Sequence, residues 1–346
     1  MKAVVYYARA EKAIEIRDLP VPTIGPEECL VEVKYCGICG SELHMYHGQL
    51  NVLARPPVIL GHEWSGEIVA VGDRVQGFAV GDRVVAETAA ETCGRCVLCR
   101  SGEYNLCPER RAFGFAVDGA FTRYVRVKYP LLHHIPAEVS WEAATMIEPI
   151  CVAYYAVVEK SRFRPGDLVV IIGPGPVGLF CLQVVRLAGA GTVIVTGSGR
   201  DQERLALARR LGADMVVNIE EQDPATLVQT LGDGLGAHLV IDAAGVPSAI
   251  QRSLQVVRRG GWVTKIGWSL QPVNLTLDEI VAKAITYQGA FSHTWKTWET
   301  CLELLRQGRI QTEPLVSAIW PITRWQEAFE KLERLEAHKI LLYPVD

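Results

Sequence analysis

The chain of 346 residues is longer than one ordinary domain and predicts two, each able to bury a core. Its 49% hydrophobic and 21% charged residues are typical of a globular protein, and a net charge of −4 argues against nucleic acid or a membrane surface as partner. The N-terminus has no long apolar core, and no run approaches the roughly 18 apolar residues of a membrane span. We therefore expect a cytoplasmic protein.

Residues 1–90 contain short apolar strands separated by Gly and Pro, such as KAVVYY, CLVEVKYC and SGEIVAVG. This pattern predicts an antiparallel barrel or a partly closed sheet. A lone histidine among such strands is usually structural, but His62 is followed by Glu63, and Cys39 comes from a nearby segment. A thiol, an imidazole and a carboxylate suit a zinc site that keeps one position open for substrate. Two residues that could move a proton, Ser41 and His44, follow Cys39.

The segment CGRCVLCRSGEYNLC crowds four cysteines into a short loop: Cys93, Cys96, Cys99 and Cys107. In a chain expected in the cytoplasm, such crowding indicates metal before disulfides. Four thiolates match a closed tetrahedral zinc site with no room for substrate. We therefore predict a structural zinc ion in this lobe, with two disulfides as the alternative.

A strand pattern over GAFTRYVRV is followed by a helical stretch that begins near Ser140. Within this stretch Glu148 stands among apolar residues and before a proline. A buried carboxylate needs a partner, and a metal ion would serve. The alternative is a carboxylate on the exposed side of a bend.

From Pro165 onward, six short apolar strands alternate with helices, which predicts a doubly wound parallel sheet. The turn after its first strand reads GPGPVG and places Gly173, Gly175 and Gly178 in the dinucleotide-binding pattern. These glycines allow a tight turn, close approach of a pyrophosphate, and close packing of helix and strand. Pro176 and Val177 then open a helix whose N–H groups can hold phosphates.

The end of the second strand of this sheet bears on the choice of cofactor. A carboxylate there would bind the adenosine ribose hydroxyls and favour NAD. Here the strand runs into Gly197, a small residue. Ser198 and Arg200 follow it and could hold a 2′-phosphate. We therefore favour NADP over NAD, although Asp201 leaves NAD open.

The residues taken together resemble the zinc-dependent medium-chain dehydrogenases, and within them the polyol, or sorbitol, dehydrogenase branch. Gly-His-Glu at 61–63 continues as WSGEIVAVGDRV, ICGSELH spans 38–44, and IEP stands at 147–149. The four-cysteine lobe matches the structural zinc loop of that family. The similarity covers nearly the whole chain and implies a Rossmann sheet inserted into a GroES-like, mostly β catalytic domain.

The resemblance implies that Cys39, His62 and Glu148 surround one catalytic zinc ion, with Glu63 as an adjacent or exchanging ligand. In some relatives a water replaces direct coordination by the residue that matches Glu148, so both arrangements stay open. Glu42 stands where the family usually has aspartate, and its implied role is to orient His62.

The resemblance also implies the reaction, which is reversible oxidation of a secondary alcohol on a small polyol, sugar or cyclitol to the ketone, with NAD(P). Zinc would act as a Lewis acid. Ser41 would accept the hydroxyl proton and pass it, through the nicotinamide ribose, to His44 and solvent. The alternative for these two residues is a turn cap and a surface histidine.

The predicted domains are residues 1–150, with the zinc lobe at about 90–110, then residues 151–293 for the dinucleotide, and residues 294–346 returning to the first domain. The family implies a homotetramer or a homodimer. Two other functions stay open: an L-threonine or simple alcohol dehydrogenase of the same family, and a nucleotide-binding homologue without catalysis.

Overall fold

The computed structural model describes residues 1–49 and 53–345 and divides into two compact units. Unit 1 comprises residues 1–148, residues 293–308 and the segment from Thr312 onward. Unit 2 comprises Pro149–Ser292 and Arg309–Gln311. Among the described residues, no helix is long and apolar enough to cross a membrane.

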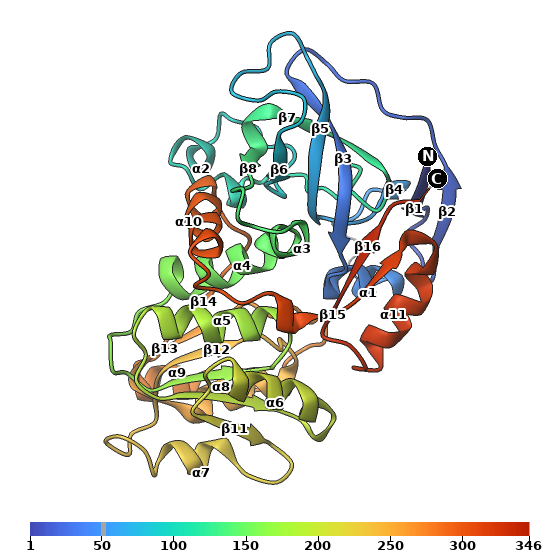
Figure 1. Ribbon diagram of the computed structural model, residues 1–346. Coiled ribbons are helices and arrows are strands. Elements are labelled where there is room, and N and C mark those ends of the chain that lie inside the picture. The colour runs from blue at the N-terminus through green and yellow to red at the C-terminus, as the bar shows by residue number, and fades with distance from the viewer. Residues whose placement is uncertain (50–52, 346) are drawn as a thin grey trace. The chain divides into compact units, whose positions relative to one another are not determined.

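Unit 1 is built on two sheets (Figure 1). The smaller sheet has the order β2 (Ile14–Asp18), β1 (Lys2–Tyr6), β4 (Val58–Ile59). The larger has the order β15 (Val316–Pro321), β16 (Lys339–Tyr343), β3 (Glu28–Gly37), β5 (Glu63–Val71), β6 (Arg83–Ala86), β8 (Leu132–His134), with β7 (Tyr124–Lys128) also pairing with β3. Side chains on β3 alternate between the core and a more exposed face, the period of two expected of a strand.

Short helices accompany these sheets. They are α1 (Gly40–Tyr46), α2 (Val97–Arg100), α3 (Trp141–Thr145), α10 (Trp295–Arg306) and α11 (Trp325–Glu333). A further helix, α4 (Ile147–Tyr154), begins in unit 1 and continues into unit 2. The predicted start near Ser140 is confirmed, because its hydroxyl accepts a hydrogen bond from the Ala143 N–H at 3.1 Å and caps α3.

Unit 2 contains one parallel sheet of six strands in the order β11-β10-β9-β12-β13-β14. The elements along the chain are β9 (Val169–Ile172), α5 (Pro176–Leu187), β10 (Val193–Gly197), α6 (Gln202–Arg210), β11 (Met215–Asn218), α7 (Pro224–Val228), β12 (Ala237–Asp242), α8 (Pro247–Val256), β13 (Val257–Lys265), α9 (Asp278–Lys283) and β14 (Thr286–Gly289). The first strand lies at the centre, so the order reverses there as in a dinucleotide-binding fold. All four residues of β9 are buried, as expected of a strand covered on both faces. The predicted doubly wound sheet is confirmed.

A buried polar cluster lies in unit 1 beside the cysteine lobe. The Glu87 carboxylate is 3% exposed and accepts a hydrogen bond from the Tyr104 hydroxyl at 2.6 Å. The same hydroxyl accepts a hydrogen bond from the Trp295 N–H at the start of α10. Burial raises the pKa of Glu87 to about 7. Ionised Glu87 is therefore costly in the folded protein.

We expect Glu87→Gln to stabilise the protein at pH 8 and to have little effect at pH 5. The pKa of Glu87 rises from an ordinary value of 4.5 to about 7 on folding, so the folded state binds its proton more tightly than the unfolded state. Wild-type stability therefore falls as the pH rises through this window, by up to about 3 kcal/mol, and the amide avoids this loss. Urea unfolding at both pH values measures the effect.

The exposed carboxylate Glu138 provides the matched control, since Glu138→Gln should leave the pH dependence unchanged. An equal effect of Glu87→Gln at pH 5 and pH 8 would contradict the assignment.

Candidate functional site

The pairing of β3 with β5 brings the predicted metal ligands together. The two strands are antiparallel, with Gly37 opposite Glu63. Cys39 lies just beyond the end of β3, and His62 lies just before β5. Gly61 makes the entry into β5 possible, because it has a φ of +92° and a Cβ there would lie 2.6 Å from the Phe121 ring. The strand register therefore places both segments at one corner of the sheet.

At this corner Cys39, His62 and Glu63 each offer a ligand atom, and these atoms all lie within 4.8 Å of one another. His62 and Glu63 are buried, and Cys39 is half-buried. Among the described residues, Oε1 of Glu63 is buried and has no hydrogen-bond partner. A buried carboxylate oxygen without a partner is costly, and a cation would satisfy it.

Glu42 connects the two segments. Its Oε2 accepts a hydrogen bond from the Cys39 backbone N–H at 2.8 Å, and its Oε1 lies 2.7 Å from His62 Nδ1. Burial works against a charged imidazole, but the Glu42 carboxylate outweighs it and raises the pKa of His62 well above its ordinary value. With Nδ1 facing Glu42, the other ring nitrogen is the one left to bind a metal.

Lys339 was not identified from the sequence. It opens β16, is 2% exposed, and its ammonium group donates to the Glu63 carboxylate and, at 2.8 Å, to the Ile38 carbonyl. Burial works against the ammonium, but the Glu63 charge outweighs it and raises the pKa of Lys339. The signal in the sequence is the position of Lys339 at the start of the apolar run KILLY. A lysine in a buried strand needs an anionic partner, so this position could have predicted one.

The charges of this corner fit a divalent cation. With Cys39 as the thiolate, Cys39, Glu42 and Glu63 are anionic, and Lys339 is the cation in contact with Glu63. With His62 as the neutral imidazole that metal binding requires, two negative charges are in excess, which is expensive in a buried setting. Zinc carries the matching charge and accepts sulfur, nitrogen and oxygen donors.

Glu148 lies near this group but is not part of it. It is 7% exposed, and its Oε1 lies 3.2 Å from Nε2 of His293, a residue that sequence reasoning missed. Burial opposes ionisation of this carboxylate, but the hydrogen bond from His293 and the charges of neighbouring residues lower the pKa of Glu148 overall.

Ser41 and His44 lie three residues apart on α1 and so share a face of that helix. Among the described residues, the Ser41 hydroxyl is buried without a hydrogen-bond partner. Nδ1 of His44 lies 2.7 Å from the amide oxygen of Gln49. Because that oxygen can only accept, Nδ1 carries the proton and Nε2 is the basic nitrogen.

The sulfur atoms of Cys93, Cys96, Cys99 and Cys107 also lie within 4.8 Å of one another. All ten cysteines are free thiols, so the disulfide alternative is wrong. The Cys93 and Cys96 N–H groups donate to Cys107 and Cys93 sulfur at 3.4 and 3.3 Å. Backbone N–H groups of Arg95 and Cys96 lower the pKa of Cys93 to about 6. Such donors stabilise thiolates, which zinc requires.

In unit 2, the glycine-rich turn connects β9 to α5. A Cβ at Gly178 would lie 2.0 Å from the Gly173 carbonyl oxygen, so only glycine allows this close packing. A Cβ at Gly175 would meet no described atom within 4 Å, so protein packing does not explain that glycine. Gly175 caps α5, and Pro176 and Val177 form its first turn. The turn therefore has room for a phosphate at the positive end of a helix.

The loop after β10 uses Asp201 for its own structure. The Asp201 carboxylate accepts hydrogen bonds from the Ser198 N–H at 2.9 Å and the Ser198 hydroxyl at 2.7 Å. Gly197 is buried, whereas Arg200 is exposed. Burial lowers the pKa of Arg204, the Asp201 carboxylate at 3.7 Å opposes this shift, and the neighbouring Arg200 charge adds to it. Two guanidinium groups therefore lie near each other at the start of α6.

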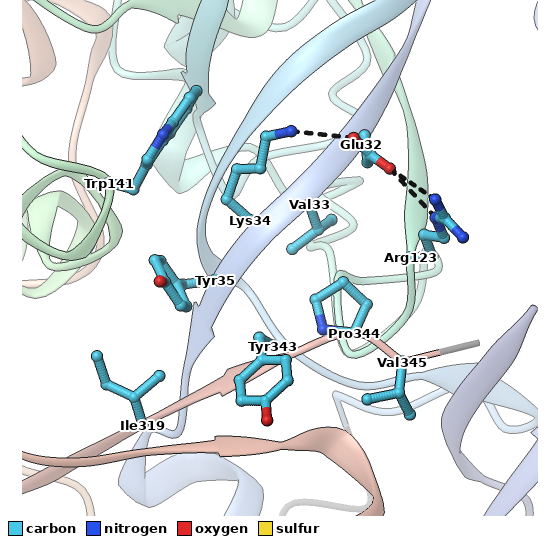
Figure 2. Close-up of a pocket in the computed structure, with 10 residues that line it drawn as sticks. All are labelled: Glu32, Val33, Lys34, Tyr35, Arg123, Trp141, Ile319, Tyr343, Pro344 and Val345. Carbon is cyan, nitrogen blue, oxygen red and sulfur yellow. Dashed lines mark hydrogen bonds and ion pairs between the residues drawn. The ribbon is translucent and has the colours of Figure 1, made fainter.

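A separate cavity of 530 Å³ opens in unit 1 between β3, Trp141 and the end of β16 (Figure 2). Its charged groups satisfy one another, because Glu32 accepts hydrogen bonds from Lys34 at 2.9 Å and Arg123 at 3.1 Å. None of the predicted site residues lines it. This cavity is therefore distinct from the candidate metal centre.

Two family models match the sequence. The model described as "Alcohol dehydrogenase GroES-like domain" matches residues 25–137. The model described as "Zinc-binding dehydrogenase" matches residues 176–307.

Individual proteins match over the full length. A sorbitol dehydrogenase of Halalkalibacterium halodurans is 40% identical and covers 100% of both chains. A D-arabitol-phosphate dehydrogenase of Enterococcus avium is 36% identical over 99% of this chain and 97% of its own. The structure of a zinc-binding dehydrogenase from Sinorhizobium meliloti bound to NADP has a TM-score of 0.91, 30% identity and 99% coverage of both chains. With these matches, the chain belongs to the zinc-dependent medium-chain alcohol dehydrogenase family and is an oxidoreductase of that family.

Proposed function

We propose that the protein oxidises a secondary alcohol of a small polyol, sugar or cyclitol to the ketone, reversibly, with NADP favoured over NAD. The observation that carries this proposal is the group of ligand atoms from Cys39, His62 and Glu63 within 4.8 Å. The likeness to a sorbitol and an arabitol-phosphate dehydrogenase supports a polyhydroxylated substrate.

Cys39, His62 and Glu63 would hold the catalytic zinc ion. When bound, zinc supplies Lewis-acid polarisation of the alcohol oxygen, and the nicotinamide supplies the hydride acceptor. Glu42 orients His62, and Lys339 compensates the Glu63 charge.

Ser41 and His44 would move the proton. The Ser41 hydroxyl has no partner among the described residues, so it can accept the proton of the substrate hydroxyl while it releases its own proton to the next group of the relay. His44 lies on the same face of α1 as Ser41. Its Nδ1 is engaged by Gln49 and its Nε2 remains basic, so Nε2 can take up a proton and pass it to solvent.

The four cysteines of the lobe would hold a second, structural zinc ion. The lobe has only the four-residue α2 and a three-residue turn of 3₁₀ helix, and α2 buries no residue. Without a core of its own, it depends on the metal for its fold.

The preference for NADP rests on the loop after β10. Ser198 already satisfies Asp201, so this carboxylate is engaged away from a ribose. Arg200 supplies positive charge at this loop, and Arg204 lies near it in an ion pair with Asp201, so the Arg200 guanidinium is the group that favours a 2′-phosphate.

Rates on sorbitol and other polyols, sugars, inositols, threonine and short alcohols, each with NAD⁺ and NADP⁺, test the proposal. We expect polyols to react fastest, and Cys39→Ser to lose at least about a thousandfold in rate, because several kcal/mol of charge stabilisation disappear. The variant should stay folded and keep the lobe zinc. Fastest turnover of threonine or short alcohols would identify the family alternative instead. Nucleotide binding without any turnover by zinc-loaded protein would indicate a non-catalytic homologue.

For the cofactor, we expect Arg200→Ala to lower kcat/KM for NADP⁺ about tenfold or more and to change it less than about twofold for NAD⁺, since a charge-assisted hydrogen bond is lost. Arg209→Ala, at the exposed end of the following helix α6, is the control. The test avoids Gly197, because a Cβ there would lie 3.0 Å from both Asp201 and Pro174. Equal losses with both cofactors would argue against a 2′-phosphate site.

For the lobe, we expect Cys99→Ser to remove one zinc per chain and to lower Tm by roughly 10 °C, because the metal contributes folding free energy. Cys301→Ser, at a buried cysteine outside the lobe, controls for loss of packing and should keep both zinc ions. Loss of turnover in a Cys99→Ser protein of undiminished stability and assembly would count against a structural role.

A further inference from the structure

A chain of two hydrogen bonds leads from α10 to Glu148. The Trp298 indole N–H donates to His293 Nδ1 at 2.7 Å. Nε2 of His293 lies 3.2 Å from Glu148 Oε1. Trp298 and His293 are each 1% exposed, so no bulk water competes with either bond.

The direction of both bonds follows from the indole. An indole N–H can only donate, so Nδ1 of His293 must be the acceptor. The ring hydrogen then sits on Nε2 and points to the Glu148 carboxylate. Trp298 therefore fixes the tautomer in which His293 donates to Glu148.

The indole is itself held in place. His133 stacks on its face with ring centres 5.4 Å apart and an angle of 10°. Nδ1 of His133 lies 2.6 Å from a Glu299 carboxylate oxygen, one residue along α10 from Trp298. The position of His293 is thus determined by packing as well as by its own hydrogen bonds.

Glu148 is hydrogen-bonded to His293 and lies outside the group of candidate metal ligands. Cys39, His62 and Glu63 have ligand atoms within 4.8 Å of one another, and Glu148 is not in this group. Burial raises the pKa of Glu63, and the negative charge of Glu148 raises it further, so the two carboxylates lie close to each other. A fourth protein ligand would complete a tetrahedral shell and close the position that a substrate needs.

We propose that His293, held by Trp298, is a positioning residue that keeps Glu148 outside the Cys39–His62–Glu63 ligand set and so keeps the metal position open. The inference rests on the proposed function, because it concerns the zinc site of that reaction. Its consequence is that loss of the His293 donor lets Glu148 bind the metal.

The test is His293→Leu, which is similar in size and cannot donate. We expect zinc release from the catalytic site to a chelator to slow about tenfold, because one more ligand must dissociate. Cobalt(II) in the site should show a changed visible spectrum, after subtraction of the spectrum of Cys39→Ser protein loaded only in the lobe. Faster release, or unchanged release and spectrum, would overturn the proposal, since a residue that orients a ligand loosens the metal on removal.

A second pair of variants shows whether His293 acts through Glu148. In a Glu148→Gln background, His293→Leu should change zinc release by less than about twofold. A persisting tenfold effect would contradict the proposal. His134→Leu, at an exposed histidine of the same unit, is the matched control and should behave as wild type.

Trp298→Phe covers the case in which His293→Leu does not fold. Phenylalanine keeps an aromatic ring at this position but lacks the N–H, so zinc release should slow as it does in His293→Leu. An unchanged rate would overturn the role of Trp298.

The zinc content of the protein separates failure of the proposed function from failure of this inference. Wild-type protein with zinc only in the lobe refutes the proposed function, whereas two zinc ions with an inert His293→Leu refute this inference alone.

Discussion

The balance of charge in a buried corner of unit 1 is the constraint on which the rest of the site depends. Glu42 and Glu63 are among the least exposed residues of the chain, and each is a carboxylate. Glu42 contacts His62 and the Cys39 N–H, and Glu63 contacts Lys339 through one of its two oxygens. Oε1 of Glu63 is buried without a partner among the described residues, and Cys39 beside it is a thiol that binds metal as a thiolate, so a bound cation would stabilise both. A divalent metal resolves both requirements at once.

The larger sheet of unit 1 makes this corner possible, since β3 is its meeting point. Along one edge β3 pairs with β5, and along the other it pairs with β7 and β16 (Figure 1). Gly37 lies opposite both Glu63 of β5 and Leu341 of β16. Three segments that are distant in sequence therefore converge where β3 ends, and the first residues beyond it supply the thiol.

Much of this arrangement could be predicted from the sequence, for physical reasons that differ between its parts. The parallel sheet of unit 2 was predictable because alternating apolar strands and helices leave few ways to pack, and the strand order confirms it. Cys39, His62 and Glu63 could be selected because their donor types suit an open zinc site, and the resemblance to the dehydrogenase family then gave them their roles. In the structure the ligand atoms of these three residues lie within 4.8 Å of one another, as a shared metal site requires.

Other parts of the site could not be read from local patterns. Lys339 is 276 residues from Glu63, and His293 is 145 residues from Glu148. Each is a single polar residue without motif spacing, and its role arises only from the tertiary contact. The contact of Glu148 with His293 is of the same kind, because a carboxylate in an apolar segment needs a partner, but the segment does not say which one.

The position of Lys339 has a consequence for biosynthesis. The thiol, imidazole and carboxylate emerge from the ribosome early, whereas the ammonium group that offsets Glu63 comes with β16, the last strand of the described chain. Until β16 pairs with β3, Glu63 therefore has no ammonium partner. A corner assembled before that pairing would be more acidic than the finished one and would attract a cation more strongly.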